Sequence, residues 1–250
     1  MNRSVFRWPA PARAAVSLSF DDARPSQLDC GVSALDSFGV KATFYVSIGP
    51  ARARSSEWAE VSERGHEIGN HSKTHPCSGN FEWVERPLED MTLDDMEREL
   101  LEANRAIGEL AGITPKTFAY PCGQSFVGRG CDCQSYVPLV ARHFEVGRAA
   151  FSETDNNPER CDLAAVASSN MDRRTWSELE QLLKLALQRG RWLVLTGHEI
   201  GPQDAHQTTR LDTLRRFCEF AAGHSELWVG TVLEVGRYVH SQRGSTNSGA

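Results

Sequence analysis

Short apolar segments alternate along the chain with longer segments in which apolar residues recur every three to four positions. The short segments predict β-strands and cover residues 15–20, 42–46, 67–69, 117–120, 145–149, 192–196 and 227–229. The longer segments predict helices and cover about residues 27–38, 57–64, 93–110, 135–143, 175–188, 211–222 and 232–239. The pattern therefore predicts about seven βα units in succession.

Two of the predicted helices begin with a recognisable capping sequence. Thr92 is followed three residues later by Asp95, and Thr175 is followed by Glu178 at the same spacing. A hydroxyl residue with an acidic residue three positions later is typical of a capping box, in which each side chain binds the other residue's backbone N–H. Gly190 ends the second of these helices. We expect both helices to start at these threonines.

Seven βα units in one chain of 250 residues favour a single α/β domain with a distorted (β/α)7-type barrel. No glycine-rich nucleotide fingerprint follows the first strand, so a doubly wound dinucleotide-binding sheet is disfavoured. We expect the domain to cover residues 1–240, and residues 241–250, which are rich in Ser, Gly and Asn, to form a disordered tail. In such barrels the reactive side chains follow the C-terminal ends of the strands.

Composition excludes several kinds of partner. The chain has 27 Lys+Arg against 33 Asp+Glu, a net charge of −6, which is the wrong balance for binding a phosphate backbone. No apolar run approaches the ~18 residues of a membrane span. No export signal is visible near the N-terminus, and seven cysteines without repeated spacing do not form a secreted disulfide framework. We therefore expect a cytoplasmic protein without nucleic-acid partners.

Four clusters of reactive residues follow predicted strands. They are Asp21-Asp22, His71-Ser-Lys-Thr-His75, Tyr120-Pro-Cys-Gly123 and Thr196-Gly-His198-Glu199. Because each lies after the C-terminal end of a strand, all four should face the same rim of the barrel. The sequence thus predicts one site at that rim.

The first two clusters suggest a metal site. His71 and His75 are four residues apart, so on a helical turn both imidazoles would point the same way. One Asp of the Asp21-Asp22 pair with two His is a suitable Zn²⁺ ligand set with a position left for water, and the other Asp would remain free as a base. The alternatives are two solvated loop histidines and an aspartate that caps a helix or turn. His198, at the end of an apolar strand, could protonate a leaving amine.

These motifs resemble the polysaccharide deacetylase family, the NodB-homology carbohydrate esterases of family 4. The resemblance rests on Ser19-Phe-Asp-Asp22, His71-Ser-Lys-Thr-His75, Phe118-Ala-Tyr-Pro-Cys-Gly123 and Leu195-Thr-Gly-His198, which occur in the family's order. It extends from about residue 15 to residue 238. It implies a distorted (β/α) barrel that holds one divalent metal ion, usually zinc, through Asp22, His71 and His75.

The resemblance also implies a role for each remaining site residue. Asp21 would be the base that takes a proton from a metal-bound water, and His198 would protonate the departing nitrogen. The backbone N–H of Cys122 would bind the oxyanion, with Tyr120 of the same motif beside the substrate. The product would be acetate and a free amine.

The sequence departs from the family's pattern at two positions. Ala23 stands where the family usually has Gly, and Ala119 stands where it has the Arg that orients the base. Arg24 and Arg148 are the candidates to replace that arginine. The carboxylate that pairs with the catalytic histidine of the family cannot be placed by motif, and Asp155 and Asp172 are both candidates.

Cysteines and aromatic residues gather near the same motifs. Cys77 and Cys122 could be close enough to form a disulfide, while Cys131-Asp-Cys133 lies in the next loop. A second metal site there is conceivable, but free or disulfide-bonded loop cysteines are the preferred interpretation because Cys-x-Cys lacks the usual zinc-knuckle spacer. Four aromatic residues could form platforms for sugar rings, with core packing as the alternative: Phe81, Trp83, Phe126 and Tyr136.

The leading functional hypothesis is a metal-dependent hydrolase that removes an N-acetyl, or an O-acetyl, group from a carbohydrate. One alternative is a hydrolase of small cyclic amides or ureides on the same fold, which need not use a metal. A second alternative is a barrel that binds glycans without turning them over. The missing motif arginine leaves both alternatives open, although all five predicted ligand, base and acid residues are present.

Overall fold

A computed structural model describes residues 6–244. Eight strands form one sheet: β1 (Ala14–Asp21), β2 (Thr43–Val46), β3 (Glu67–Asn70), β4 (Thr117–Ala119), β7 (Val146–Arg148), β8 (Ser169–Asn170), β9 (Trp192–Gly197) and β12 (Leu227–Val229). Eight α-helices accompany them: α1 (Val32–Asp36), α2 (Ile48–Ala53), α3 (Ser55–Glu63), α4 (Leu93–Ala111), α5 (Val137–His143), α6 (Trp176–Arg189), α7 (Leu211–Gly223) and α8 (Val232–Gly244). The α/β class predicted from the sequence is confirmed.

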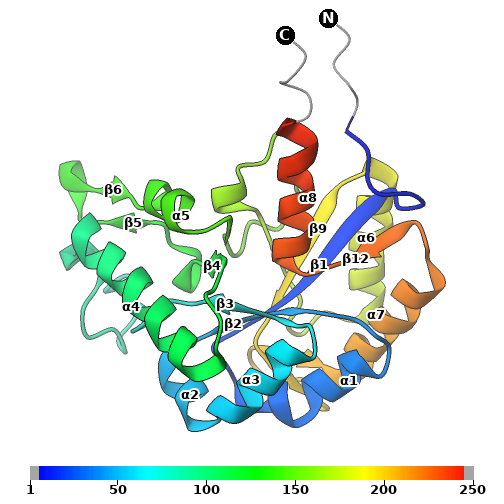
Figure 1. Ribbon diagram of the computed structural model, residues 1–250, viewed down its shortest axis with the longest axis horizontal. Coiled ribbons are helices and arrows are strands. Elements are labelled where there is room, and N and C mark those ends of the chain that lie inside the picture. Colours follow the sequence, from blue (N-terminus) through cyan, green and yellow to red (C-terminus); the bar gives the residue numbers. More distant parts are fainter. Residues whose placement is uncertain (1–5, 245–250) are drawn as a thin grey trace, which may run out of the picture.

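The sheet is parallel and curled. Its strand order is β7-β4-β3-β2-β1-β9-β8, and β12 pairs in parallel with the first residues of β1. A parallel bridge between Arg148 and Val166 connects β7 to the segment that leads into β8. The two edges of the sheet therefore meet through this segment, as in a distorted barrel. Figure 1 shows the helices arranged around the strands.

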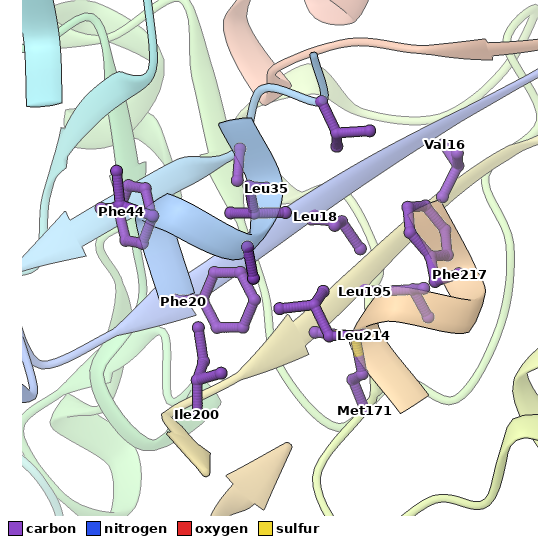
Figure 2. Close-up of a cluster of buried hydrophobic side chains, with 14 of the residues drawn as sticks. Val16, Leu18, Phe20, Leu35, Phe44, Met171, Leu195, Ile200, Leu214 and Phe217 are labelled. Carbon is purple, nitrogen blue, oxygen red and sulfur yellow. The ribbon is translucent and has the colours of Figure 1, made fainter. Parts of the chain in front are cut away.

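Strand β1 is buried along its whole length, and alternate residues serve two purposes. Val16, Leu18 and Phe20 belong to the largest apolar cluster, where Leu214 of α7 also packs (Figure 2). Because side chains alternate between the two faces of a strand, Asp21 points to the opposite face from Phe20. The hydrophobic packing of β1 thus turns Asp21 toward the interior of the barrel.

The predicted helix starts are confirmed. Thr92 and Asp95 form a capping box at the start of α4, and Thr175 and Glu178 form one at the start of α6. Gly190 adopts the left-handed conformation directly after α6, a conformation that glycine reaches without a steric penalty. Local sequence signals therefore determine where these two helices begin and where α6 ends.

Several short elements were not predicted. They are α2, the antiparallel pair β5 (Phe126–Val127) and β6 (Gln134–Ser135), the two-residue strand β8, and the parallel pair β10 (Glu199–Gly201) and β11 (Thr208–Arg210). Helix α8 continues through residue 244, four residues into the stretch expected to be disordered, because Arg243 donates hydrogen bonds to the carbonyls of Pro158 and Cys161. Residues 245–250 of that predicted tail lie outside the described residues.

None of the helices between residues 6 and 244 combines the length and the apolar character needed to cross a membrane.

Candidate active site

The four predicted clusters meet around one cavity of about 780 Å³. It opens where the loops that follow β1, β3, β4 and β9 come together, at the C-terminal ends of these strands. The residues that bear reactive groups on its wall are Asp21, Asp22, Arg24, His71, His75, Cys122, His198, Glu199 and His206. The prediction that one rim of the barrel gathers these motifs is therefore confirmed by the structure.

Asp22, His71 and His75 form a compact group of possible ligands. The Nε2 atoms of His71 and His75 each lie 3.5 Å from Oδ1 of Asp22, and the three ligand atoms lie within 4.8 Å of one another. The Nδ1 atom of His71 lies 2.9 Å from the carbonyl oxygen of Ala119. Metal-ligating histidines usually donate their second ring nitrogen in this way, which fixes the ring with its other nitrogen toward the ion. One carboxylate and two imidazoles with this orientation fit a zinc-type site.

The two histidines converge through a loop rather than through the helical turn expected from their spacing. Ser72 and His75 have φ values of 65° and 57°, in the left-handed region that non-glycine residues rarely occupy. Two hydrogen bonds hold this loop: Ser72 N–H donates to Asn70 Oδ1, and His75 N–H donates to Ser72 Oγ. The prediction of adjacent imidazoles was right, but its helical explanation was wrong because local side-chain bonds replace the helix here.

Electrostatics favour the ligand forms of these residues. Burial acts to raise the pKa of Asp22, but the neighbouring His71, His75 and Arg24 outweigh it, so the pKa lies below its ordinary value. Burial and the neighbouring His71 lower the pKa of His75 to about 4. A charged Asp22 carboxylate beside a neutral His75 imidazole is the state in which these two groups bind a divalent ion.

Asp21 has a different partner from its neighbour. Nη2 of Arg148, which is fully buried, lies 2.5 and 2.6 Å from the two carboxylate oxygens of Asp21. Arg24 instead donates two hydrogen bonds to Oδ2 of Asp22, at 3.2 and 2.9 Å. Of the two arginines suggested by the sequence, Arg148 of β7 therefore contacts Asp21. Position 119, where the family usually has its arginine, lies beside Arg148 in the β4–β7 register.

His198 is held by one of the two carboxylates that the sequence suggested. Nδ1 of His198 lies 2.7 Å from Oδ2 of Asp172, while Oδ1 of Asp172 accepts hydrogen bonds from the His198 N–H and from Thr209. Burial opposes the charge on His198, but Asp172 and then Asp21 outweigh it, so the pKa of His198 is raised. Asp155, the other candidate, pairs with Arg189 outside the cavity.

Sequence reasoning missed a glutamine that connects the two strand ends. Gln27 is fully buried, and its Nε2 donates to the backbone carbonyls of Asp21 and His198, at 2.6 and 2.9 Å. It thereby fixes the end of β1 relative to the end of β9. No sequence signal marks it, because glutamine has no motif spacing to either strand.

The third motif forms a tight turn beside the ligand group. Cys122 adopts a left-handed conformation with a φ of 54° and is joined by a disulfide bond to Cys77, as its position in the sequence allowed. Tyr120 borders the cavity, but its hydroxyl donates to the carbonyl of Ala164 and is buried there. Burial raises the pKa of Tyr120, so this phenol stays protonated.

Aromatic side chains divide between the core and the cavity wall. Phe126 and Tyr136 pack in the apolar cluster around Phe118, so the core alternative holds for both. Phe81 and Trp83 line the cavity with exposed fractions of 41% and 58%. Phe151, which sequence reasoning missed, lines it too and is 61% exposed. The wall therefore combines polar reactive groups with three exposed rings.

Comparison with known proteins agrees with these motifs. The sequence model of the polysaccharide deacetylase family matches residues 9–127, which contain Asp21, Asp22, His71, His75 and Cys122. This part of the chain is therefore similar to the polysaccharide deacetylase family. The chain is 36% identical over 98 residues to a chitooligosaccharide deacetylase from Sinorhizobium fredii and 28% identical over 117 residues to a peptidoglycan-N-acetylglucosamine deacetylase from Bacillus cereus.

These two alignments span 37% and 45% of the chain, and 39% and 38% of the relatives' own lengths. The fold likeness extends further than the sequence likeness. A crystal structure of a candidate polysaccharide deacetylase from Mycobacterium smegmatis matches with a TM-score of 0.71 and 18% identity, over 95% of this chain and 94% of the other. The shared fold thus includes β7, which carries Arg148. It also includes β8 and β9, which are followed by Asp172 and His198.

Proposed function

We propose that this protein is a metal-dependent hydrolase that removes acetyl groups, N-acetyl or O-acetyl, from a carbohydrate. The observation that carries the proposal is that two adjacent carboxylates have different partners. Asp22 faces His71 and His75, whereas Asp21 is held apart by Arg148. One acidic residue is thus available as a ligand and the other as a base, as hydrolysis by an activated water requires.

Asp22, His71 and His75 would hold the ion, which we expect to be zinc because two imidazoles and a carboxylate are typical zinc ligands. When bound, a divalent ion of this kind polarises a carbonyl and lowers the pKa of water. The protein's part is to supply three preformed ligands: the position of Asp22 at the end of β1 and the backbone-anchored ring of His71 achieve this without a large rearrangement.

Asp21 would act as the base. Its carboxylate lies 3.9 Å from Nε2 of His71, so it stands next to the ligand group without belonging to it. Arg148 fixes the orientation of the carboxylate, and Thr196 accepts a further hydrogen bond from Arg148. In this position Asp21 can take the proton of a water that attacks the acetyl carbon.

His198 would act as the acid. Asp172 binds its Nδ1, which leaves Nε2 as the nitrogen that can give a proton to the departing amine. The raised pKa of His198 favours the protonated ring that this role needs. The backbone N–H of Cys122, in a turn on the cavity wall, would donate to the oxyanion.

The test uses N-acetylglucosamine oligomers as the substrate, with acetate release and metal content measured on the same samples. Asp21→Asn should retain about one divalent ion per chain and lose acetate release, because the amide cannot act as a base. His75→Ala should lose both the ion and the activity. Acetate release at the wild-type rate by Asp21→Asn, or wild-type protein that binds no ion from a zinc solution, would overturn the mechanism.

A further inference from the structure

A disulfide bond lies against the proposed ligand group. It joins Cys77, two residues after His75, to Cys122 in the turn after β4, so it connects two loops of the cavity. Cys77 is fully buried, whereas Cys122 is half-buried and lines the cavity. A small thiol that enters the cavity can therefore reach the Cys122 sulfur.

The imidazole of His75 lies between this disulfide and Asp22. Its Nε2 is 3.5 Å from Oδ1 of Asp22, and its Nδ1 is 3.7 Å from Sγ of Cys77. His71 differs in this respect, because its Nδ1 contacts the carbonyl oxygen of Ala119. Nδ1 of His75 thus faces the Cys77 sulfur. Reduction of the disulfide would turn that sulfur into a thiol, whose thiolate form binds metal ions.

The distances suit a common ion. One ligand atom from each of His75, Cys77 and Cys122 lies within 4.8 Å of the others. After reduction the two sulfurs must separate to about 3.7 Å, the spacing of two thiolates bound at about 2.3 Å to one tetrahedral ion. Two thiolates with an imidazole select zinc and softer ions, such as cadmium. While the two sulfurs are bonded to each other, they cannot serve as thiolate ligands.

We propose that reduction of the Cys77–Cys122 disulfide creates a thiolate–imidazole metal site made of Cys77, Cys122 and Nδ1 of His75. A dithiol supplies two electrons and two protons: the S–S bond breaks, two S–H groups form, and the dithiol becomes a disulfide. A divalent ion then displaces the two thiol protons as it binds, and His75 offers Nδ1 while it keeps its one ring proton on Nε2. The oxidised form therefore leaves His75 to the Asp22 group alone, whereas in the reduced form the two thiolates compete with that group for His75. This proposal goes beyond the deacetylase function and does not depend on it.

The experiment measures the binding of Co²⁺, because the absorption spectrum of bound cobalt shows whether thiolates are among its ligands. Cys131→Ser/Cys133→Ser serves as the background, because it removes the two exposed free thiols that could bind the probe elsewhere. One sample stays oxidised, and another is reduced with dithiothreitol and desalted under nitrogen before Co²⁺ is added. A thiolate-to-cobalt charge-transfer band in the near ultraviolet should appear in the reduced sample and be absent from the oxidised one.

Single variants then identify the ligands. Cys77→Ser and Cys122→Ser in this background should each lose most of the band, and His75→Gln should weaken cobalt binding. A reduced protein without the band, or a band that survives Cys77→Ser, would overturn the proposal. A second readout needs no variant of the site: zinc should protect Cys77 and Cys122 of the reduced background protein from alkylation, measured by peptide mass spectrometry. Equal alkylation with and without zinc would also overturn it.

Discussion

The guanidinium of Arg148, on β7, contacts both carboxylate oxygens of Asp21, at the end of β1, at 2.5 and 2.6 Å. Both side chains are buried, so the arginine supplies the opposite charge that a buried carboxylate needs. Its Cζ atom also lies over the Tyr45 ring, 5.1 Å from the ring centre, a contact that further restricts the guanidinium. Asp21 is thus paired with an arginine that lies on a different strand of the sheet.

Replacement of Arg148 should therefore impair catalysis more than replacement of Arg24. We expect Arg148→Ala to lower turnover at least about 10-fold with the bound metal retained, because Asp21 loses its orientation and its charge partner. The unpaired buried carboxylate should also cost about 3–5 kcal/mol of folding stability. Acetate release, metal content and thermal unfolding measured on the same preparations separate the two effects.

Arg24→Ala is the matched control, because Arg24 contacts Asp22 and is more exposed. It should change turnover less than Arg148→Ala. Arg148→Lys should recover part of the stability without full turnover, since an ammonium group cannot reproduce the planar guanidinium contact. Equal turnover in Arg148→Ala and the wild type would show that Arg148 does not orient the base.

Asp172→Asn should change how activity depends on pH. His198 must carry its proton to act as an acid, so activity falls as the pH rises through its pKa. Asp172 helps to raise that pKa, and the variant removes its charge. The alkaline limb of the kcat/KM profile should therefore move to lower pH, and turnover near neutral pH should fall.

Asp155→Asn provides the control for this prediction, because Asp155 pairs with Arg189 rather than with His198. Its pH profile should match that of the wild type. An Asp172→Asn profile with an unchanged alkaline limb would mean that His198 does not give up the proton in the step that limits kcat/KM.

The sequence could indicate the four residues around Asp22 as candidate ligands and base because their spacing is local. Asp21 and Asp22 end a strand, and the two histidines lie four residues apart, so short-range patterns are sufficient to identify them. Asp172 could not be separated from Asp155, since both are acidic loop residues. The parallel register decides between them: Asn170 of β8 pairs with Thr196 of β9, which brings the residues two positions later, Asp172 and His198, side by side.

Other features could not be predicted because they depend on contacts between distant segments. Strand β8 has two residues, too few for a hydrophobic period, and its position follows from pairing with β9. Gln27 bonds to two backbone carbonyls, an arrangement that no residue spacing encodes. Phe151 has a positive φ in an irregular loop. Its residue type would suggest a buried side chain, so nothing in the sequence indicated that the ring is exposed.

The exposed rings on the cavity wall should contribute to substrate binding. Trp83 and Phe151 line the cavity, and large apolar groups exposed in this way often mark ligand sites. We expect Trp83→Ala and Phe151→Ala to raise KM for an N-acetylglucosamine tetramer several-fold while kcat changes little. The effect should be smaller for the monomer, which covers fewer rings.

Leu101→Ala is the control for these two variants, because Leu101 is 41% exposed on α4 and does not line the cavity. Its kinetic constants should equal those of the wild type. If the tetramer and the monomer lost affinity to the same extent in Trp83→Ala and Phe151→Ala, a platform for further sugar rings would be contradicted.

Gly197, the last residue of β9, should not tolerate a side chain. A Cβ atom there would lie 2.4 Å from Oγ1 of Thr209 and 3.0 Å from Oδ1 of Asp172, the two groups whose hydrogen bond positions His198. Gly197→Ala should therefore lower stability by about 1–3 kcal/mol and reduce turnover, measured by urea unfolding and acetate release. Gly49→Ala in α2 is the control, because no atom lies within 4 Å of its added Cβ. Wild-type stability and turnover in Gly197→Ala would show that the Asp172–Thr209 arrangement can shift without loss.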